Sequence, residues 1–214
     1  LEPKDALLTL DARLPSIDSL EGAELAFELK GERLDAWSGV VGQALPRWGP
    51  YRLSAQAHYT QASLQVANLR LALDGLPMQA SHLEIGSGTA VLGVNIDTRL
   101  TVEGRIGDAA FSLDASSAPL PSLQKTGGTR PLTLRGSLAQ LALSAQGSIA
   151  LTDTVPHFDL ALTAQGDALE PARLFAGVLF RQALPVDLSA RLTNTREGYS
   201  ARNIRGRYRG TTVA

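Results

Sequence analysis

The sequence of 214 residues contains no cysteine, which excludes disulfide bonds and every metal site built on thiolates. Aromatic residues make up 5% of the chain, so large rings contribute little to its interior. The charges nearly cancel, with 20 Lys and Arg against 21 Asp and Glu. The chain therefore lacks the excess of positive charge that nucleic-acid binding requires. Without cysteine, the sequence leaves open whether the compartment is periplasmic or cytosolic.

Long apolar runs are also missing. No stretch approaches the roughly 20 apolar residues of a membrane-spanning helix, and no signal-peptide pattern precedes the first predicted strand. The sequence begins at Leu1, and Met78 is its only methionine. We expect the chain to be a water-soluble piece of a longer protein, whose membrane anchor, if it has one, lies outside these residues.

Residues that could support catalysis are few and scattered. His58, His82 and His157 lie in separate segments without a partner at metal-ligand spacing. The sequence has no nucleophile elbow, phosphate-binding loop or zinc-protease motif, and its carboxylates are spread over predicted outward-facing positions. We therefore predict no catalytic site, no metal and no cofactor.

What the sequence does contain is a repetition. The tetrapeptide Gln-Ala-Leu-Pro at residues 43–46 returns at residues 182–185, each time after an alternating strand and a Gly and before a Leu-Ser-Ala strand. Farther along, Asn68 and Asn203 are 135 residues apart, as are Gly75 and Gly210. This order predicts duplicated β-helix-β units, and repeats of this size are typical of extended, stackable folds.

Most of the chain alternates apolar and polar residues with the period of a half-buried strand. Clear runs are Leu8/Leu10/Ala12, Leu53/Ala55/Ala57, Leu132/Leu134 and Leu188/Ala190/Leu192. The pattern is typical of antiparallel sheets with one solvated face. We predict a mainly β protein, with long antiparallel strands in a curved, twisted sheet that forms an open groove or half-barrel.

Two features of the alternation indicate where strands end or bulge. Residues 89–106 keep one parity throughout, which fits either an odd-numbered turn near residues 95–98 or a single strand of about 60 Å at ~3.3 Å per residue. We favour the long strand. At Asn68 and Asn203 the parity changes, which predicts a turn or β-bulge at both, because Asn tolerates left-handed backbone.

Two short amphipathic helices are expected at residues 34–45 and 168–184. The second has a capping box, with Asp167 and Glu170, and Pro171 in its first turn. Residues 116–131 are rich in Ser, Pro and Gly and are interpreted as a connector. The chain is thus divided into a first repeat unit (1–115), the connector (116–131) and a second unit (132–214), and one continuous sheet across both units is left open.

An apolar sheet face must be covered by a second sheet, a helix or a ligand, and this chain offers only two helices. Leu, Ala, Val and Ile dominate the predicted inward positions, which favours a smooth apolar groove. The predicted lining residues are Leu92, Val94, Ile96, Leu100, Val102, Phe111, Leu113, Leu141, Leu143, Phe158, Leu160, Leu162 and Leu188.

Three alternating arginines mark the end of the chain: Arg205, Arg207 and Arg209. The favoured interpretation is a solvated face or a charged strand edge that prevents unwanted pairing. The alternative is contact with anionic lipid headgroups.

The order of strand, Gly, short helix, small-x-Leu-Pro, Leu-Ser-Ala strand and a strand ending in Gly resembles the AsmA family of Gram-negative envelope proteins, relatives of the TamB and YhdP type. The resemblance covers about half the chain, and the second copy lacks the Gly-Pro-Tyr that follows the first Pro corner. It is carried by Leu29-Lys30-Gly31, residues 44–51, Leu73-Asp74-Gly75, residues 162–166, Ala183-Leu184-Pro185 and residues 209–213.

The resemblance implies a periplasmic protein anchored in the inner membrane, with a hydrophobic β-groove through which phospholipids cross between the two membranes. Phospholipid would be its partner, with envelope proteins as further partners and no role for nucleic acid. The alternative is a non-catalytic envelope scaffold that assists outer-membrane protein assembly and whose apolar faces close on each other. A hydrolase is disfavoured because the sequence offers no catalytic constellation.

Overall fold

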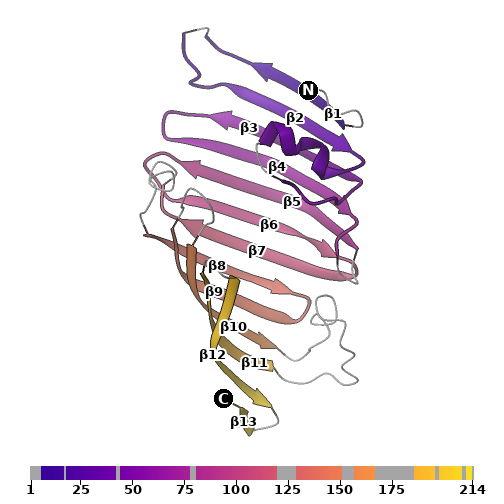
Figure 1. Cartoon of the computed structure of the whole chain (residues 1–214). Coiled ribbons are helices and arrows are strands. Elements are labelled where there is room, and N and C mark those ends of the chain that lie inside the picture. The colour runs from indigo at the N-terminus through magenta and orange to yellow at the C-terminus, as the bar shows by residue number, and fades with distance from the viewer. Residues whose placement is uncertain are drawn as a thin grey trace.

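The computed structural model describes residues 6–16, 18–41, 44–77, 81–119, 129–150, 157–166, 186–195, 198–208 and 211–213. Within these ranges the chain forms one antiparallel sheet of 13 strands, each paired with its neighbour in sequence (Figure 1). The predicted mainly β, antiparallel architecture is confirmed. The sheet is open, because β1 and β13 lie at its two ends and do not pair with each other.

The strands have the following bounds: β1 (Ala6–Arg13), β2 (Glu24–Gly31), β3 (Tyr51–Tyr59), β4 (Ser63–Asp74), β5 (His82–Gly93), β6 (Thr98–Ile106), β7 (Ala109–Ser117), β8 (Thr129–Leu138), β9 (Leu141–Ala150), β10 (His157–Gly166), β11 (Val186–Thr195), β12 (Gly198–Tyr208) and β13 (Thr211–Val213). Strands β7 and β8 pair directly, with Ser117 opposite Leu132. One sheet therefore continues across the predicted connector. Residues 120–128 of that connector lie outside the described residues.

Large and small residues alternate along a row that crosses the sheet. We call this the central row, and cross-strand pairing joins its residues one to the next from β1 to β11. Within this row a large apolar side chain is followed each time by alanine, so two bulky residues of the row are never direct cross-strand neighbours. The row consists of Ala12, Leu25, Ala57, Val66, Ala90, Leu100, Ala115, Leu134, Ala145, Leu162 and Ala190.

The two predicted bulges are confirmed. Asn68 has φ 54° and Asn203 has φ 52°, both in the left-handed region. The pairing of β3 with β4 shifts between Ser54 and Gln56, and that of β11 with β12 shifts between Ser189 and Arg191. Each bulge inserts one residue, so the apolar residues on either side of it stay on the same face although their parity changes.

The strand pairing around the two bulges also coincides at an offset of 135 residues. Leu29 faces Leu53 in the β2–β3 pair, and Ala164 faces Leu188 in the β10–β11 pair. The β1–β2 pair and the β9–β10 pair match in the same way, since Leu8 faces Leu29 and Leu143 faces Ala164. Strands β1–β4 and β9–β12 therefore share one register.

The favoured single strand over residues 89–106 is wrong. Strand β5 ends at Gly93, a turn follows, and β6 begins at Thr98. Ala90 faces Leu100, so the two paired positions have the same parity and the turn leaves the alternation unchanged. Counted from the paired positions Val91 and Arg99, the connection has seven residues (92–98), so it is the odd-numbered turn that was the alternative. Val94 and Ile96 lie in the turn rather than in a strand, and 49% of Ile96 is exposed.

The first predicted helix is shorter than expected. A 3-10 helix, η1 (Leu34–Trp37), leads into a single turn of α-helix, α1 (Ser38–Val41), instead of one helix to residue 45. Gly39 in the middle lowers helix propensity, and so short a helix depends on packing. The second predicted helix, residues 168–184, lies outside the described residues.

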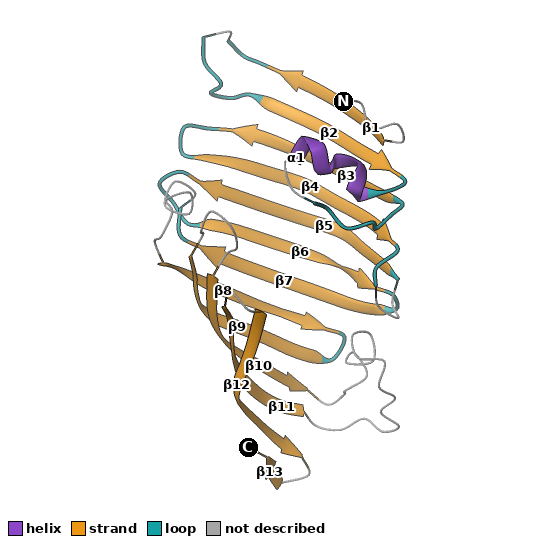
Figure 2. Ribbon diagram, viewed as in Figure 1, coloured by secondary structure: helices purple, strands orange, loops and turns teal. Residues whose placement is uncertain are grey.

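The segment between β2 and β3 covers part of the apolar face, and we call residues 34–41 and 44–50 the clip. Figure 2 shows its helical part in front of β2, β3 and β4. Tyr51, Leu73 and Leu76 form a buried cluster, and Leu34, Trp37 and Trp48 of the clip pack against it. Trp37 Nε1 donates a hydrogen bond to Tyr51 Oη. Backbone bonds join the clip to β4, since Gly49 N donates to Asp74 O over 2.8 Å.

The sheet changes shape along its length. In Figure 1, β2 to β7 lie side by side as a broad layer, whereas β8 to β12 twist progressively and part of β12 runs nearly upright. Glycines occupy the twisted part where strands approach closely: a β-carbon at Gly147 would lie 1.9 Å from Asp159 O. Only glycine fits such a position.

Candidate functional site

The apolar face of β7 to β12 contains a pocket of about 490 Å³, which we call the furrow. Its exposed lining is almost entirely apolar. Six neighbouring strands contribute to it, so it crosses the sheet rather than following one strand. The lining residues are Ser112, Leu113, Leu134, Arg135, Gly136, Leu143, Ser144, Ala145, Leu162, Thr163, Ala164, Leu188, Ser189, Ala190 and Ile204.

The alternation of large and small residues accounts for the hollow. Besides the central row, a second row of paired positions crosses the furrow: Leu113, Gly136, Leu143, Ala164, Leu188 and Gly206. The small residues of both rows leave space between the leucines of neighbouring strands. Gly136 is required, because a β-carbon on it would lie 2.2 Å from Ser112 O.

The size of the furrow suits an alkyl chain. Neighbouring strands are ~4.8 Å apart, so the five spacings from β7 to β12 span about 24 Å. Half of the ~30 Å hydrocarbon core of a bilayer, about 15 Å, is the depth that the acyl chains of one leaflet fill. The volume also lies within the range of ~300–1,000 Å³ that is usual for ligand pockets.

Several leucine and isoleucine side chains of the furrow keep access to solvent. The exposed fraction is 38% for Leu143, 41% for Leu188 and 57% for Ile204. Covering apolar surface contributes ~25 cal/mol per Å², so a hydrophobic ligand would gain by covering these residues. The furrow can thus bind by burial alone, without any reactive group.

The structure brings four of the predicted lining residues into the furrow: Leu113, Leu143, Leu162 and Leu188. On the same face of β7, β9 and β10, next to the furrow, lie Phe111, Leu141, Phe158 and Leu160, of which Leu141 and Leu160 are buried. Leu92, Leu100 and Val102 lie on β5 and β6, outside the furrow lining. Val94 and Ile96 lie in the β5–β6 turn.

Sequence reasoning missed Leu134, Ile204 and the alanines of the furrow. Leu134 belongs to an alternating run, so its parity carries the signal. Ile204 follows the bulge at Asn203, and its place on the apolar face follows once the bulge is recognised. The alanines became visible only through pairing, because their role is to be small beside a leucine of the next strand.

Of the three predicted headgroup arginines, Arg205 is the one whose side chain the structure describes, and it does not lie beside the furrow lining. Arg205 pairs with Ser189 and is exposed, so its side chain is on the polar face, opposite the furrow. The backbone of Arg207 pairs with Asp187 on the same parity. Arg209 lies outside the described residues. A headgroup above the furrow therefore faces away from Arg205.

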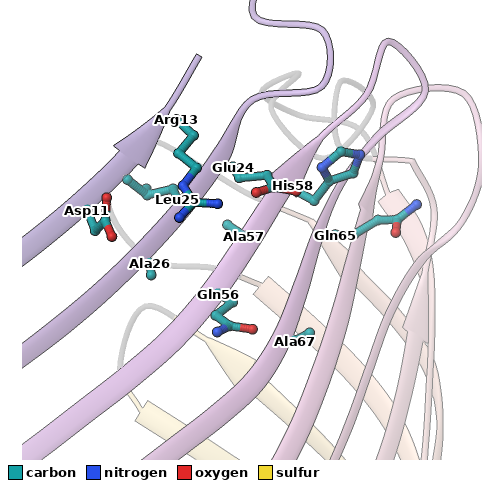
Figure 3. A pocket seen from close by; sticks show the side chains of 10 residues that line it. All are labelled: Asp11, Arg13, Glu24, Leu25, Ala26, Gln56, Ala57, His58, Gln65 and Ala67. Atoms are coloured by element: carbon teal, nitrogen blue, oxygen red, sulfur yellow. The ribbon is translucent and has the colours of Figure 1, made fainter. Parts of the chain in front are cut away.

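A second pocket, of about 420 Å³, lies on the polar face of β1 to β4. Figure 3 shows its side chains, among them Asp11 and Arg13 of β1, Glu24 of β2 and His58 of β3. Charges of both signs are mixed there, and His58 faces Glu24 across the β2–β3 pair. This arrangement is typical of a solvated sheet face, and the single imidazole lacks the partners of a catalytic site.

Ion pairs on the polar face and in the clip stabilise carboxylates. The hydrogen bond from Arg191 Nε to Asp159 Oδ1, 2.7 Å long, lowers the pKa of the Asp159 carboxyl. The side-chain hydrogen bond from Arg33 likewise lowers the pKa of Asp35, with Arg47 adding charge attraction. The Asp159 side chain is largely exposed and that of Asp35 is half-buried, each accepts a hydrogen bond from its arginine, and these shifts reflect cross-strand and clip pairing rather than catalytic chemistry.

The described part of the chain contains no group of three or more His, Asp or Glu residues that could hold a metal ion. His82 pairs with Asp74, Nδ1 to Oδ1 over 2.7 Å, at the end of the β4–β5 hairpin. None of the helices in the described ranges has the length and apolar character needed to cross a membrane. Comparisons of the chain with known protein families, with curated proteins and with solved structures find no match.

Proposed function

We propose that this protein is an AsmA-like, non-catalytic β-groove protein of the periplasm that binds phospholipid acyl chains in the furrow and conducts them between the inner and outer membranes. The observation that carries the proposal is the furrow: a pocket of about 490 Å³ with an almost wholly apolar exposed lining, spread over six strands of an open sheet. Such a surface suits a flexible hydrocarbon better than a polar substrate.

The energetics of acyl chains fit transfer rather than storage. Each buried CH₂ contributes ~0.8 kcal/mol, and a single myristoyl chain binds a membrane only reversibly, with K ~10⁴ M⁻¹. A furrow that covers one side of such a chain holds it weakly enough to release it. The partly exposed Leu143 and Leu188 are the side chains that a passing chain would contact.

The proposal includes the origin of the sheet by duplication of one β-helix-β unit. The shared register of β1–β4 and β9–β12 and the two equivalent Asn bulges support an origin from copies of one unit. A sheet extended by repetition can carry a continuous apolar face over a long distance. The periplasmic location and an inner-membrane anchor outside these residues follow from the same resemblance and belong to this proposal.

The test is lipid content after purification without detergent, measured by native mass spectrometry and by lipid extraction. We expect phospholipid bound to the wild-type protein. Leu143→Glu and Leu188→Glu place a carboxylate in the furrow and should abolish lipid binding, because a buried charge is costly. The matched control is Gln146→Glu, which puts the same charge on the exposed polar face of β9.

Far-UV circular dichroism of all three variants should keep the β signal. Wild-type protein free of phospholipid would contradict the proposal. Equal loss of lipid in Gln146→Glu would show that net charge rather than the furrow controls binding. Lipid-free protein that binds an envelope protein tightly would instead favour the scaffold function.

A further inference from the structure

Strand β1 is an unshielded edge of the sheet. It pairs with β2 along its whole length without a bulge, and its other side has no partner among the described residues. Its residues from Leu7 to Arg13 are all exposed, including Leu8 at 52% and Leu10 at 59%. Proteins usually shield such an edge with a bulge, a proline or a charge on the inner face, and β1 contains none of these. The edge is therefore open to a further strand.

The free side of β1 presents the backbone groups of its even-numbered residues. Tyr59 N donates to Ala23 O, and bonded residues alternate in an antiparallel pair, so the odd-numbered residues of β2 bond to β3. The even-numbered residues of β2 then bond to β1, where they pair with odd-numbered residues. The N–H and C=O groups of Leu8, Leu10 and Ala12 are thus left for a strand on the other side.

The second half of the sheet shows what fits beside such a strand. In the register shared by β1–β4 and β9–β12, β1 corresponds to β9 and Leu8 corresponds to Leu143. Strand β9 is not an edge, because β8 pairs with it and sets Leu134 opposite Ala145 and Gly136 opposite Leu143. A strand with the sequence pattern of β8 therefore fits beside β1.

Strand β1 itself carries the pattern of β8. Residues 8–14 read Leu-Thr-Leu-Asp-Ala-Arg-Leu, and residues 132–138 read Leu-Thr-Leu-Arg-Gly-Ser-Leu. The first, second, third and last positions are identical, and the fifth position is small in both segments. Strand β1 is thus equivalent to β9 in register and similar to β8 in sequence. A second copy of β1 can therefore take beside β1 the place that β8 takes beside β9.

We propose that two copies of this chain pair β1 against β1 about a two-fold axis, in the register that β8 and β9 use. Leu10 then faces its own counterpart, Leu8 faces Ala12, and Thr9 faces Asp11. Facing residues have the same parity, so the apolar faces of both copies lie on one side of a continuous antiparallel sheet. The pairing uses the β1 edge of both copies, so the contact closes as a dimer. This inference does not rest on the proposed function.

Charge favours this register. Thr9 opposite Asp11 repeats a cross-strand pair that the sheet already contains, since Thr101 Oγ1 donates to Asp114 Oδ1 over 2.8 Å in the β6–β7 pair. A shift of two residues in one direction would set Asp11 against its own counterpart. Like charges directly opposite each other are destabilising, which disfavours that shift.

Side-chain size favours the same register. Leu8 opposite Ala12 sets a large residue beside a small one, as along the central row. A shift of two residues in the other direction would set Leu8 against Leu10 on both sides of the axis and Ala6 against Ala12. The proposed register has a single pair of large residues, Leu10 and its counterpart, at the axis itself.

Single cysteines can report the register, because the chain contains none of its own. Hydrogen-bonded residues that face each other in an antiparallel pair have Cα atoms ~5.5 Å apart, within the range of about 4.4–6.8 Å that disulfides span. Leu10→Cys should therefore form a disulfide-linked dimer under mild oxidation. The matched control is Ala12→Cys on the same strand and face, whose counterpart lies four residues from the facing position, about 13 Å away. It should not crosslink alone, but should form a mixed dimer with Leu8→Cys.

Sedimentation velocity over a concentration series measures the dimer without crosslinking. We expect a monomer–dimer equilibrium for the wild-type protein. Leu10→Pro removes an N–H that points to the free edge and leaves the β1–β2 bonds intact, so it should be monomeric with an unchanged β signal in circular dichroism. Thr9→Glu should raise the Kd of the dimer by about two- to thirtyfold, because it faces Asp11 twice, and Thr9→Lys should lower it by a similar factor.

Four results would overturn the proposal. The first is wild-type protein that stays monomeric at every concentration. The second is a dimer that persists in Leu10→Pro, which would place the interface elsewhere. The third is crosslinking of Ala12→Cys alone as fast as that of Leu10→Cys, which would indicate another register. The fourth is binding of a synthetic peptide of residues 129–138 to a chain that never self-associates, which would assign the edge to a strand of another polypeptide.

Discussion

Two regions of the same apolar face differ in what covers them. Over β2 to β5 the clip packs against the sheet, and the exposed fractions of Tyr51 and Leu73 fall to 4% and 5%. Over β7 to β12 the furrow leaves 38% of Leu143 and 41% of Leu188 exposed. The strands of both regions follow one alternation. The difference teaches that strand pattern specifies an apolar face, whereas the connecting segments decide whether that face is covered.

The clip also explains where the scarce aromatic residues are used. Both tryptophans of the chain, Trp37 and Trp48, lie in the clip and pack against the Tyr51 cluster. Large rings bury much apolar area per residue, which suits a short segment that must cover a broad face. The furrow lining contains no aromatic residue and consists of Leu, Ile, Ala and Gly with intervening polar positions.

The largest expected effect contrasts one leucine from each region. Leu73→Ala removes a buried side chain beneath the clip and should lower the free energy of unfolding by about 2–5 kcal/mol. Leu188→Ala in the furrow should lower it by less than about 1 kcal/mol, because much of that side chain already contacts water. Urea unfolding followed by fluorescence measures both. Equal losses would break the comparison and indicate that the furrow is closed in solution.

A second contrast uses glycines. Gly147→Ala would place a β-carbon 1.9 Å from Asp159 O and should destabilise the protein by about 1–3 kcal/mol, since the backbone must move. Gly86 of β5 has no atom within 4 Å of such a β-carbon. Gly86→Ala should therefore be neutral or stabilise by up to about 1 kcal/mol. A tolerated Gly147→Ala in urea unfolding would contradict the close approach of β9 and β10.

The hydrogen bond of the clip gives a smaller effect. Trp37→Phe removes the donor to Tyr51 Oη and should cost about 0.5–1.5 kcal/mol of unfolding free energy. In a Tyr51→Phe background the same substitution should cost less, because the bond is already lost. The double-mutant cycle isolates this term. Additive losses would show that the two side chains do not interact, which would weaken the case for a fixed clip.

The smallest effect concerns pH and the polar face beneath the furrow. The hydrogen bond from Arg191 lowers the pKa of Asp159, so its stabilisation is fully present above the carboxyl pKa of the unfolded chain, ~3.9, and is lost as pH falls through the lower folded value. Asp159→Asn should lower the urea midpoint at pH 7 and have no effect near pH 2. The pair is exposed, so the shift should be small. If the difference in urea midpoint between wild type and Asp159→Asn were the same at pH 2 as at pH 7, the ionised Asp159 carboxylate would not be its cause.

Local pattern was enough to predict the strands, the antiparallel sheet and both Asn bulges, because alternation and a parity change are direct consequences of strand geometry. The β5–β6 turn was misjudged because its odd-numbered turn, with Ala90 opposite Leu100, preserves parity and leaves no signal in the alternation. The helix at residues 34–41 ended early because a short helix depends on tertiary packing, which periodicity does not report.

The furrow was only partly predictable for a related reason. Parity identified Leu113, Leu143, Leu162 and Leu188 as inward-facing, but it gave the same status to Val102, which lies outside the furrow. Parity does not separate these two groups, because the row of alternating large residues and alanines runs through both regions. Pairing partners such as Leu134 with Ala145 become known only with the register.

The central row repeats every two strands, and so does the direction of the chain in an antiparallel sheet. Inserting or deleting one hairpin, which is two strands, would keep both the alternation of large and small residues and the alternation of strand direction. Inserting or deleting a single strand would place two large residues opposite each other and reverse the direction of every later strand. Proteins built on this plan can therefore change the length of their sheet in steps of one hairpin, about 10 Å at ~4.8 Å per strand, without redesigning the surface that joins the steps.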